Sequence, residues 1–155
     1  MDKGELSAVN GKENSPEKNI EILENIASKY AIGRDIHVGD TIIGIKGRVG
    51  FEAAAALITI KAHHLLEKHT LSKWQLQHKD YLANWYGTHL HEGQYLEPVM
   101  RDLEAFLESS QKQVTGEVYV SLHPYRFQLD GIRSDFDLMN SGFGKYGEEN
   151  NAWTA

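Results

Sequence analysis

Apolar residues recur along the chain with two different periods, which predicts both strands and helices. Residues 4–10 alternate in steps of two and end at the turn dipeptide Asn10-Gly11, a pattern typical of a short strand. Ser15-Pro16 predicts the N-cap and the first residue of a helix. The apolar stripe of this helix runs over residues 20–30, and Gly33 supplies a stop signal after it.

The middle of the chain predicts a strand region followed by two helices. Residues 35–46 are rich in β-branched side chains, so we expect one strand or a bent pair of strands with Gly39-Asp40 at the bend. Residues 52–70 have helical spacing, and their first half is apolar nearly all round, which predicts a buried helix. The next helix, capped by Ser72, carries a wide aromatic stripe that we expect to lie in the core, formed by Leu71, Trp74, His78, Tyr81, Leu82 and Trp85.

The second half of the chain changes from helical to strand periodicity. A further helix is predicted to begin near Glu97-Pro98. Residues 117–132 alternate in steps of two around His123-Pro124-Tyr125, which predicts a β-hairpin. Residues 141–155 show no period. This order of elements predicts a single α+β domain with a mixed or antiparallel sheet and several helices.

Composition narrows the class of protein. The 155 residues suffice for one domain with a sizeable core, and the 41% hydrophobic and 25% charged contents are ordinary for a globular protein. The net charge of -6 argues against a nucleic-acid partner, which would require a basic face. There is no cysteine, and neither a membrane-spanning run nor a signal peptide is recognisable. We therefore expect a cytoplasmic protein without a membrane partner.

Three glycines stand at regular spacing before the second predicted helix. Gly44, Gly47 and Gly50 enclose the basic residues Lys46 and Arg48. A helix N-terminus behind a glycine-rich loop can bind an anion through free amide groups. The spacing matches neither the dinucleotide fingerprint nor the P-loop, however, so a tight turn into the helix is the alternative.

The remaining polar residues give no strong catalytic or metal pattern. His63, His64 and His69 lie near a predicted helix C-terminus, where the helix dipole stabilises a charged imidazole without a metal. His89 and His91 are two residues apart and diverge on a helix, so no zinc site is predicted. On these residues alone, the prediction is an α+β domain with one candidate anion loop.

Residues 31–63 resemble the synthetase domain of argininosuccinate synthase. That family has a segment of the form G-I-G-R-x-D-x-V-E-N-R-x-I-G-x-K-S-R-G-x-Y-E, followed by a helix. Farther along, residues 116–120 resemble its G-x-V-x-V strand, and residues 131–134 resemble its G-R-x-S turn. The resemblance extends from about Gly4 to Gly147. The matching positions in the first segment are Ile32-Gly33-Arg34, Val38, Ile43-Gly44, Lys46, Arg48 and Glu52.

The resemblance implies a ligase of arginine biosynthesis. Such enzymes use ATP, with magnesium, to adenylate citrulline, and aspartate then displaces AMP. Their pyrophosphate loop, S-G-G-x-D-T-S, lies in an N-terminal nucleotide-binding domain and does not occur here. The resemblance therefore implies that residues 1–146 are the C-terminal substrate-binding domain and that residues 147–155 are a truncated tail leading to an oligomerisation arm.

The implied partners follow from the same resemblance. They are citrulline or an N-acylcitrulline, aspartate, the protein's own N-terminal domain, and further copies of the enzyme, as in a homotetramer. The fragment alone is expected to be inactive, because it has neither the ATP site nor most of the aspartate site, and no catalytic residue is assigned to it.

Two family positions that contact citrulline are changed. The glutamate of V-E-N is Gly39 here, and the tyrosine of Y-E is Phe51. Losing a carboxylate would leave a charged α-amino group unpaired, at a cost of several kcal/mol. We therefore hypothesise an acylated substrate, such as N-succinyl- or N-acetylcitrulline, with Lys46 or Arg48 binding an added carboxylate. Alternatively, Asp40 replaces the glutamate, or the match shifts by one position near Gly39.

Two other functions remain open. The chain could be a non-catalytic module that binds a small molecule or mediates oligomerisation, as the changes at Gly39 and Phe51 would allow. A free-standing metal hydrolase that uses His89 and His91 would require bound zinc.

Overall fold

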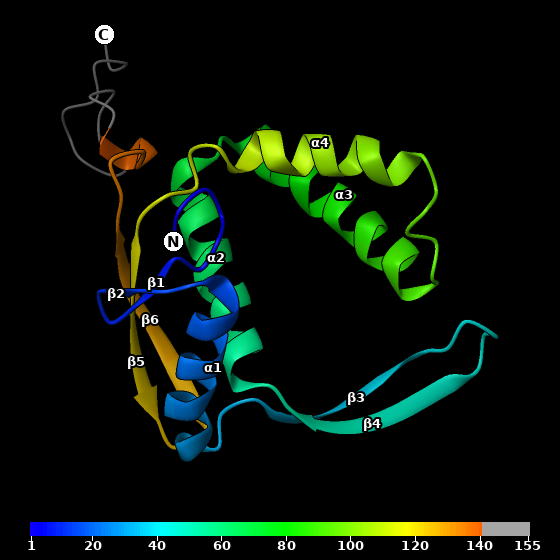
Figure 1. Ribbon diagram of the computed structural model, residues 1–155, viewed down its shortest axis with the longest axis horizontal. Helices are drawn as coiled ribbons and strands as arrows, with labels where there is room; N and C mark the ends of the chain where they lie inside the picture. The colour runs from blue at the N-terminus through cyan, green and yellow to red at the C-terminus, as the bar shows by residue number, and fades with distance from the viewer. Residues whose placement is uncertain (141–155) are drawn as a thin grey trace, which may run out of the picture.

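The computed structural model describes residues 1–140, which fold as an α+β domain (Figure 1). These residues form four α-helices and three separate two-stranded antiparallel sheets. The predicted fold class is therefore confirmed, with antiparallel pairing throughout the described sheets. Residues 141–155, including the predicted tail, lie outside the described range. No helix among residues 1–140 combines the length and the apolar character that a membrane crossing requires.

The body of the molecule consists of two helices against a hairpin. Helices α1 (Pro16–Ala27) and α2 (Ala54–Thr70) cover one face of β5 (Glu117–His123) and β6 (Arg126–Arg133) (Figure 1). As predicted, Ser15 caps α1, and its hydroxyl accepts a hydrogen bond from the Lys18 amide. The core between these elements contains the buried residues Ala27, Ile32, Ala54 and Ile58, against which Leu23, Val120, Leu122 and Phe127 pack.

Helix α2 is buried on one side only. Ala54, Ile58, Ala62 and Leu66 are buried, whereas Leu57 and Ile60 are exposed. The prediction that its apolar first half is buried all round is therefore wrong. The described elements cover the face of α2 toward α1 and the β5–β6 hairpin and leave the opposite face uncovered.

A short hairpin lies near the N-terminus. Strands β1 (Ala8–Val9) and β2 (Lys12–Glu13) pair across Asn10 and Gly11, both of which have positive φ. The predicted turn is confirmed, but the strand is shorter than the predicted residues 4–10. The 3₁₀ helices Ser28–Tyr30 and Leu138–Asn140 complete the described elements.

A long hairpin extends from the body (Figure 1). Strands β3 (Arg34–Asp40) and β4 (Lys46–Glu52) pair along their whole length. The chain reverses at residues 41–45, where the Thr41 amide and hydroxyl both donate to the Ile45 carbonyl. The predicted bend at Gly39-Asp40 is therefore wrong. The expected loop around Gly47 and Gly50 is also wrong, because both glycines lie within β4.

The two ends of this hairpin meet at one point of the body. The Ala53 amide donates a hydrogen bond to the Gly33 carbonyl at 3.1 Å. A Cβ on Gly33 would lie 2.6 Å from the Ala53 carbonyl carbon, and Gly33 has φ of +76°. Only glycine fits there without displacing the backbone. We call this contact between Gly33 and Ala53 the neck.

Helices α3 (Lys73–His91) and α4 (Val99–Gln111) form a second projection, which we call the arm (Figure 1). Ser72 caps α3 as predicted and forms a reciprocal capping box with Gln75. Of the predicted stripe, Leu71 is buried in the core as expected, but no residue of α3 itself is buried, and Trp74 and Tyr81 are 62% and 61% exposed. His78 on the same stripe is also exposed. Within the described chain, α3 packs mainly on α4, which leaves its other face open.

Candidate functional site

Pairing in the β3–β4 hairpin sorts its side chains onto two faces. Directly opposed residues share a face, and the face alternates along each strand. His37 pairs with Val49 and Gly39 with Gly47, which defines one face. We call it the groove face. Asp35 and Phe51, which also pair, belong to the same face.

The opposite face of the hairpin carries most of its charge. The pairs on this face are Arg34 with Glu52, Ile36 with Gly50, Val38 with Arg48, and Asp40 with Lys46. We call it the charged face. The five residues expected at the substrate site are therefore divided: Gly39 and Phe51 lie on the groove face, whereas Asp40, Lys46 and Arg48 lie on the charged face.

The groove face borders an open groove of about 470 Å³ that also includes the end of the arm. His91, the last residue of α3, contributes to its wall. In Figure 1 this end of α3 lies beside the turn of the hairpin. The groove is lined by His37, Gly39, Asp40, Thr41, Ile42, Ile43, Gly47, Val49 and His91.

Gly39 lies directly beneath the His37 ring. A Cβ added at Gly39 would be 2.5 Å from His37 Nε2, closer than two such atoms can approach. The imidazole therefore occupies the space into which a side chain at position 39 would extend. The groove therefore presents an imidazole at this position.

On the charged face, most charges are already paired. Lys46 Nζ lies 2.6 Å from Asp40 Oδ1, and Arg34 lies 3.0 Å from Glu52. Both pairs are exposed, so each contributes little to stability. Arg48 has no ion pair or hydrogen bond within residues 1–140 and is the cation of this face that remains available to a ligand.

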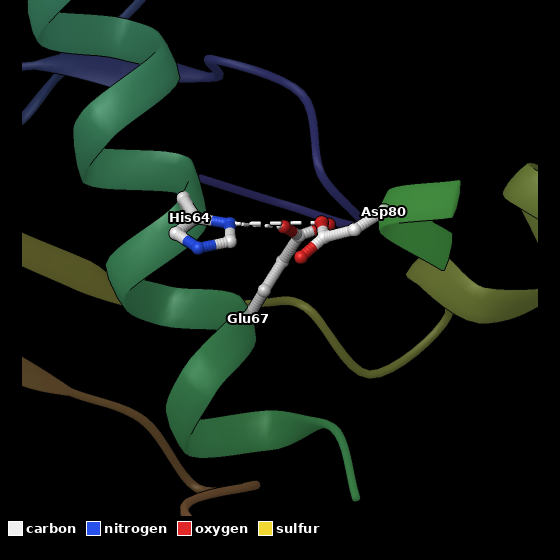
Figure 2. Close-up of side chains that lie close together, drawn as sticks. All are labelled: His64, Glu67 and Asp80. Carbon is white, nitrogen blue, oxygen red and sulfur yellow. Dashed lines mark ion pairs between the residues drawn. The ribbon is translucent and has the colours of Figure 1, made fainter. Parts of the chain in front are cut away.

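A second cluster of ionisable groups lies where the arm joins the body. Figure 2 shows His64 and Glu67 of α2 and Asp80 of α3 directed toward one another, with the His64 imidazole 3.4 Å from Glu67 and 3.9 Å from Asp80. One ligand atom from each residue lies within 4.8 Å of the others. Histidine and carboxylate groups at such separations are of the type that holds zinc.

Protein groups already satisfy this second cluster. Lys79 Nζ lies 2.6 Å from Glu67 Oε2 and 3.4 Å from Asp80 Oδ1, so an ammonium group supplies the positive charge. Gln111 of α4 donates to the other oxygen of Glu67 at 2.8 Å. Glu67 is fully buried, and the cluster therefore acts as a structural junction between α2, α3 and α4.

The remaining histidines near these helix ends also have partners. His63 bonds Gln111 at 2.7 Å, His69 bonds Asp137 at 3.1 Å, and His89 bonds the Trp85 carbonyl at 2.8 Å. His89 thus faces its own helix, while His91 faces the groove. The metal-binding interpretation of this pair has no support among the described residues.

The two histidines of the groove were not among the residues expected at the substrate site. His37 could have been found from strand alternation, because it is two positions before Gly39 and so shares its face. His91 gave no such signal, because its place at the groove depends on the packing of the arm.

The family model and the similar curated proteins all point to the same family. The family model described as the arginosuccinate synthase C-terminal domain matches residues 1–153. Argininosuccinate synthase of Dehalococcoides mccartyi (strain CBDB1) is 37% identical over 146 residues, which are 94% of this chain and 36% of that protein. The Xylella fastidiosa (strain Temecula1) enzyme is 36% identical over 139 residues, which are 90% of this chain and 35% of that protein.

A more distant bacterial relative matches over the same extent. Argininosuccinate synthase of Dictyoglomus thermophilum is 33% identical over 146 residues, which are 94% of this chain and 37% of that protein. The chain thus spans little more than a third of the length of the curated relatives it matches.

Proposed function

This chain belongs to the argininosuccinate synthase C-terminal domain family, and we propose that it is the substrate-binding part of an ATP-dependent ligase that joins citrulline, or an N-acylated citrulline, to aspartate. The relatives named above are argininosuccinate synthases, which supports the reaction class. Under this proposal, residues 1–146 hold the citrulline-type substrate. ATP and magnesium bind mainly to an N-terminal domain, and the complete enzyme assembles as a homotetramer in the cytoplasm.

The proposed chemistry has two steps. The ureido oxygen of the substrate attacks the α-phosphorus of ATP, and pyrophosphate leaves. The aspartate amine then attacks the ureido carbon, loses a proton, and expels AMP together with the ureido oxygen. This chain contributes no catalytic residue to either step, so the fragment alone is inactive under the proposal.

The position of His37 over Gly39 carries the finer proposal of an acylated substrate. A free citrulline α-ammonium group beside position 39 would meet the His37 imidazole, and the Asp40 carboxylate in the groove lining is already paired with Lys46. Leaving such a charge unpaired costs several kcal/mol in a closed site. An acylated nitrogen carries no charge and removes this penalty. Phe51, which lacks a phenolic hydroxyl, fits the same loss of polar contacts on that face.

The alternative in which Asp40 replaces the missing glutamate requires a rearrangement. Asp40 belongs to the charged face and is paired with Lys46 at 2.6 Å. Asp40 also borders the groove beside the hairpin turn, so its carboxylate would have to exchange Lys46 for the substrate ammonium. Lys46 and Arg48 are likewise on the charged face, so either would contact an acyl carboxylate only at the edge of the hairpin.

The changes at Gly39 and Phe51 are also compatible with a non-catalytic function. A non-catalytic module on this fold could lose the glutamate and the tyrosine without consequence.

Pyrophosphate release by the full-length protein decides between the ligase and the non-catalytic module. It is measured with ATP, magnesium, aspartate and either citrulline, N-acetylcitrulline or N-succinylcitrulline. We expect turnover of an acylated substrate and little or none of citrulline. Turnover of citrulline at an equal rate would refute the acyl proposal, and no release with any of the three would favour the module.

A further inference from the structure

Two histidine side chains of the groove have no protein partner within the described chain. His37 and His91 make no hydrogen bond or ion pair within residues 1–140, whereas His63, His69 and His89 are each bonded to a protein oxygen. The two free imidazoles come from different elements, β3 and α3, yet line the same groove. Each can donate an N–H group to a ligand oxygen.

The electrostatics of the groove favour a ligand with acceptor oxygens. Asp40 is the one carboxylate among its lining residues, and Lys46 neutralises it from the charged face. The imidazoles bring no negative charge to the groove. A ligand ammonium would therefore meet a carboxylate that is already paired with Lys46, whereas a carbonyl or carboxylate would find two donors.

The walls of the groove suit a short hydrocarbon segment. Ile42 and Ile43 in the turn, together with Val49 on β4, supply apolar surface beside the two imidazoles. Gly39 and Gly47 lie opposite each other and add no side chain to the groove, and the His37 ring covers Gly39. An acyl group combines methylene carbons with oxygen acceptors and matches this lining.

We infer that the groove is an acyl subsite, in which His37 and His91 hold the oxygens of an acyl group attached to the α-nitrogen of the citrulline-type substrate. This inference rests on the proposed function and deepens it, because it assigns the acyl contacts to two named residues. The shared chemistry is an N-acyl group, and its source is either a neutral acyl such as acetyl or a dicarboxylic acyl such as succinyl. In the second case, the terminal carboxylate would accept from an imidazole.

The test is steady-state kinetics of the full-length protein with His37→Leu and His91→Leu. We expect each variant to raise KM for the acylated substrate about 10- to 100-fold, the loss expected for one hydrogen bond to a charged or strongly polar group. The KM values for ATP and aspartate should not change. His37→Gln and His91→Gln, which keep an N–H donor, should recover part of the loss. His89→Leu is the matched control, because His89 lies on the same helix but bonds the Trp85 carbonyl.

The outcomes separate this inference from the function on which it rests. If the wild-type protein turns over no citrulline derivative, the proposed function fails. If it turns over an acylated citrulline and both leucine variants keep the wild-type KM, the acyl subsite is refuted while the function stands. A larger loss for N-succinylcitrulline than for N-acetylcitrulline would support binding of the terminal carboxylate. Equal losses would support binding of the amide carbonyl.

Discussion

Gly39 is the residue at which a single side chain would alter both the charge and the shape of the groove. A glutamate there must displace the His37 ring, since its Cβ would lie 2.5 Å from Nε2. The ring is the end of a side chain and can rotate away, so the hairpin itself should keep its pairing.

We predict that Gly39→Glu shifts the full-length protein from acylated citrulline toward citrulline. The new carboxylate would pair with a free α-ammonium group, while the displaced imidazole would no longer bind the acyl group. The ratio of the two kcat/KM values should change by at least about tenfold, which corresponds to about 1.4 kcal/mol. Gly50→Glu is the control, because Gly50 lies on the charged face with open space around it. An unchanged ratio in Gly39→Glu would contradict the assignment of this position to the substrate.

Lys79 is the residue on which the buried Glu67 carboxylate depends. We predict that Lys79→Met destabilises the protein by about 3–5 kcal/mol, the usual cost of leaving a buried charge without its partner. Urea unfolding would measure this loss. Lys68→Met, at an exposed position of α2, should change stability by less than about 0.5 kcal/mol. Equal effects of the two substitutions would show that the Glu67 junction contributes little.

Between elements, the contact of α3 with α4 includes a hydrogen bond that should respond to alkali. Tyr86 Oη donates to Glu104 Oε1 at 3.1 Å, and burial, followed by this bond, raises the pKa of Tyr86. A raised folded-state pKa means that the contribution is fully present below the unfolded value, about 10, and is lost as the pH rises through the folded value.

We therefore predict that, as the pH rises above about 10, the wild-type protein loses stability more steeply than Tyr86→Phe does. Thermal unfolding at a series of pH values would measure the difference. Tyr81→Phe, at an exposed position of the same helix, should follow the wild-type curve. A Tyr86→Phe curve that overlays the wild type would exclude this bond as a source of alkaline sensitivity.

Elements marked by local signals could be predicted from the sequence, whereas those set by distant packing could not. Ser15, Ser72 and the Asn10-Gly11 turn act on residues within a few positions, and all three are confirmed. The aromatic stripe of α3 correctly marked one helical face, but periodicity cannot show whether that face has a partner. The glycines of β4 favoured a loop because glycine is rare in strands, and cross-strand pairing overrode that preference.

The same distinction applies to the candidate site. Gly39 and Phe51 could be selected because they depart from a family pattern, and alternation places both on one face. The place of His91 in the groove depends on how α3 packs against the body, and so does the ion pair of Glu67 with Lys79. No local sequence pattern encodes this packing.

For the molecule as a whole, two projections leave the body with large apolar surfaces uncovered. The β3–β4 hairpin exposes Ile36, Val38, Ile42, Ile43, Ile45, Val49 and Phe51, and α3 exposes Trp74, Tyr81 and Trp85. An isolated two-stranded hairpin is marginally stable in water. We therefore propose that the rest of the full-length enzyme covers these surfaces.

We predict that hairpin amides exchange rapidly in this chain alone and more slowly in the full-length protein. Hydrogen exchange followed by mass spectrometry would report residues 34–52 separately from β5 and β6, which pack against α2 and should exchange slowly in both forms. Hairpin protection equal to that of β5 and β6 in the chain alone would contradict this expectation.

The neck between Gly33 and Ala53 has a consequence for how this protein family can diversify. Because both ends of the hairpin meet at the backbone hydrogen bond between Gly33 and Ala53, its sequence can be replaced as one segment while the core beneath α1 and α2 is kept. A chimera that carries the corresponding segment of a relative should fold like its parent while adopting the donor's ligand preference. The neck thus lets the β3 and β4 part of the groove change as a unit, while His91 stays with the arm of the parent.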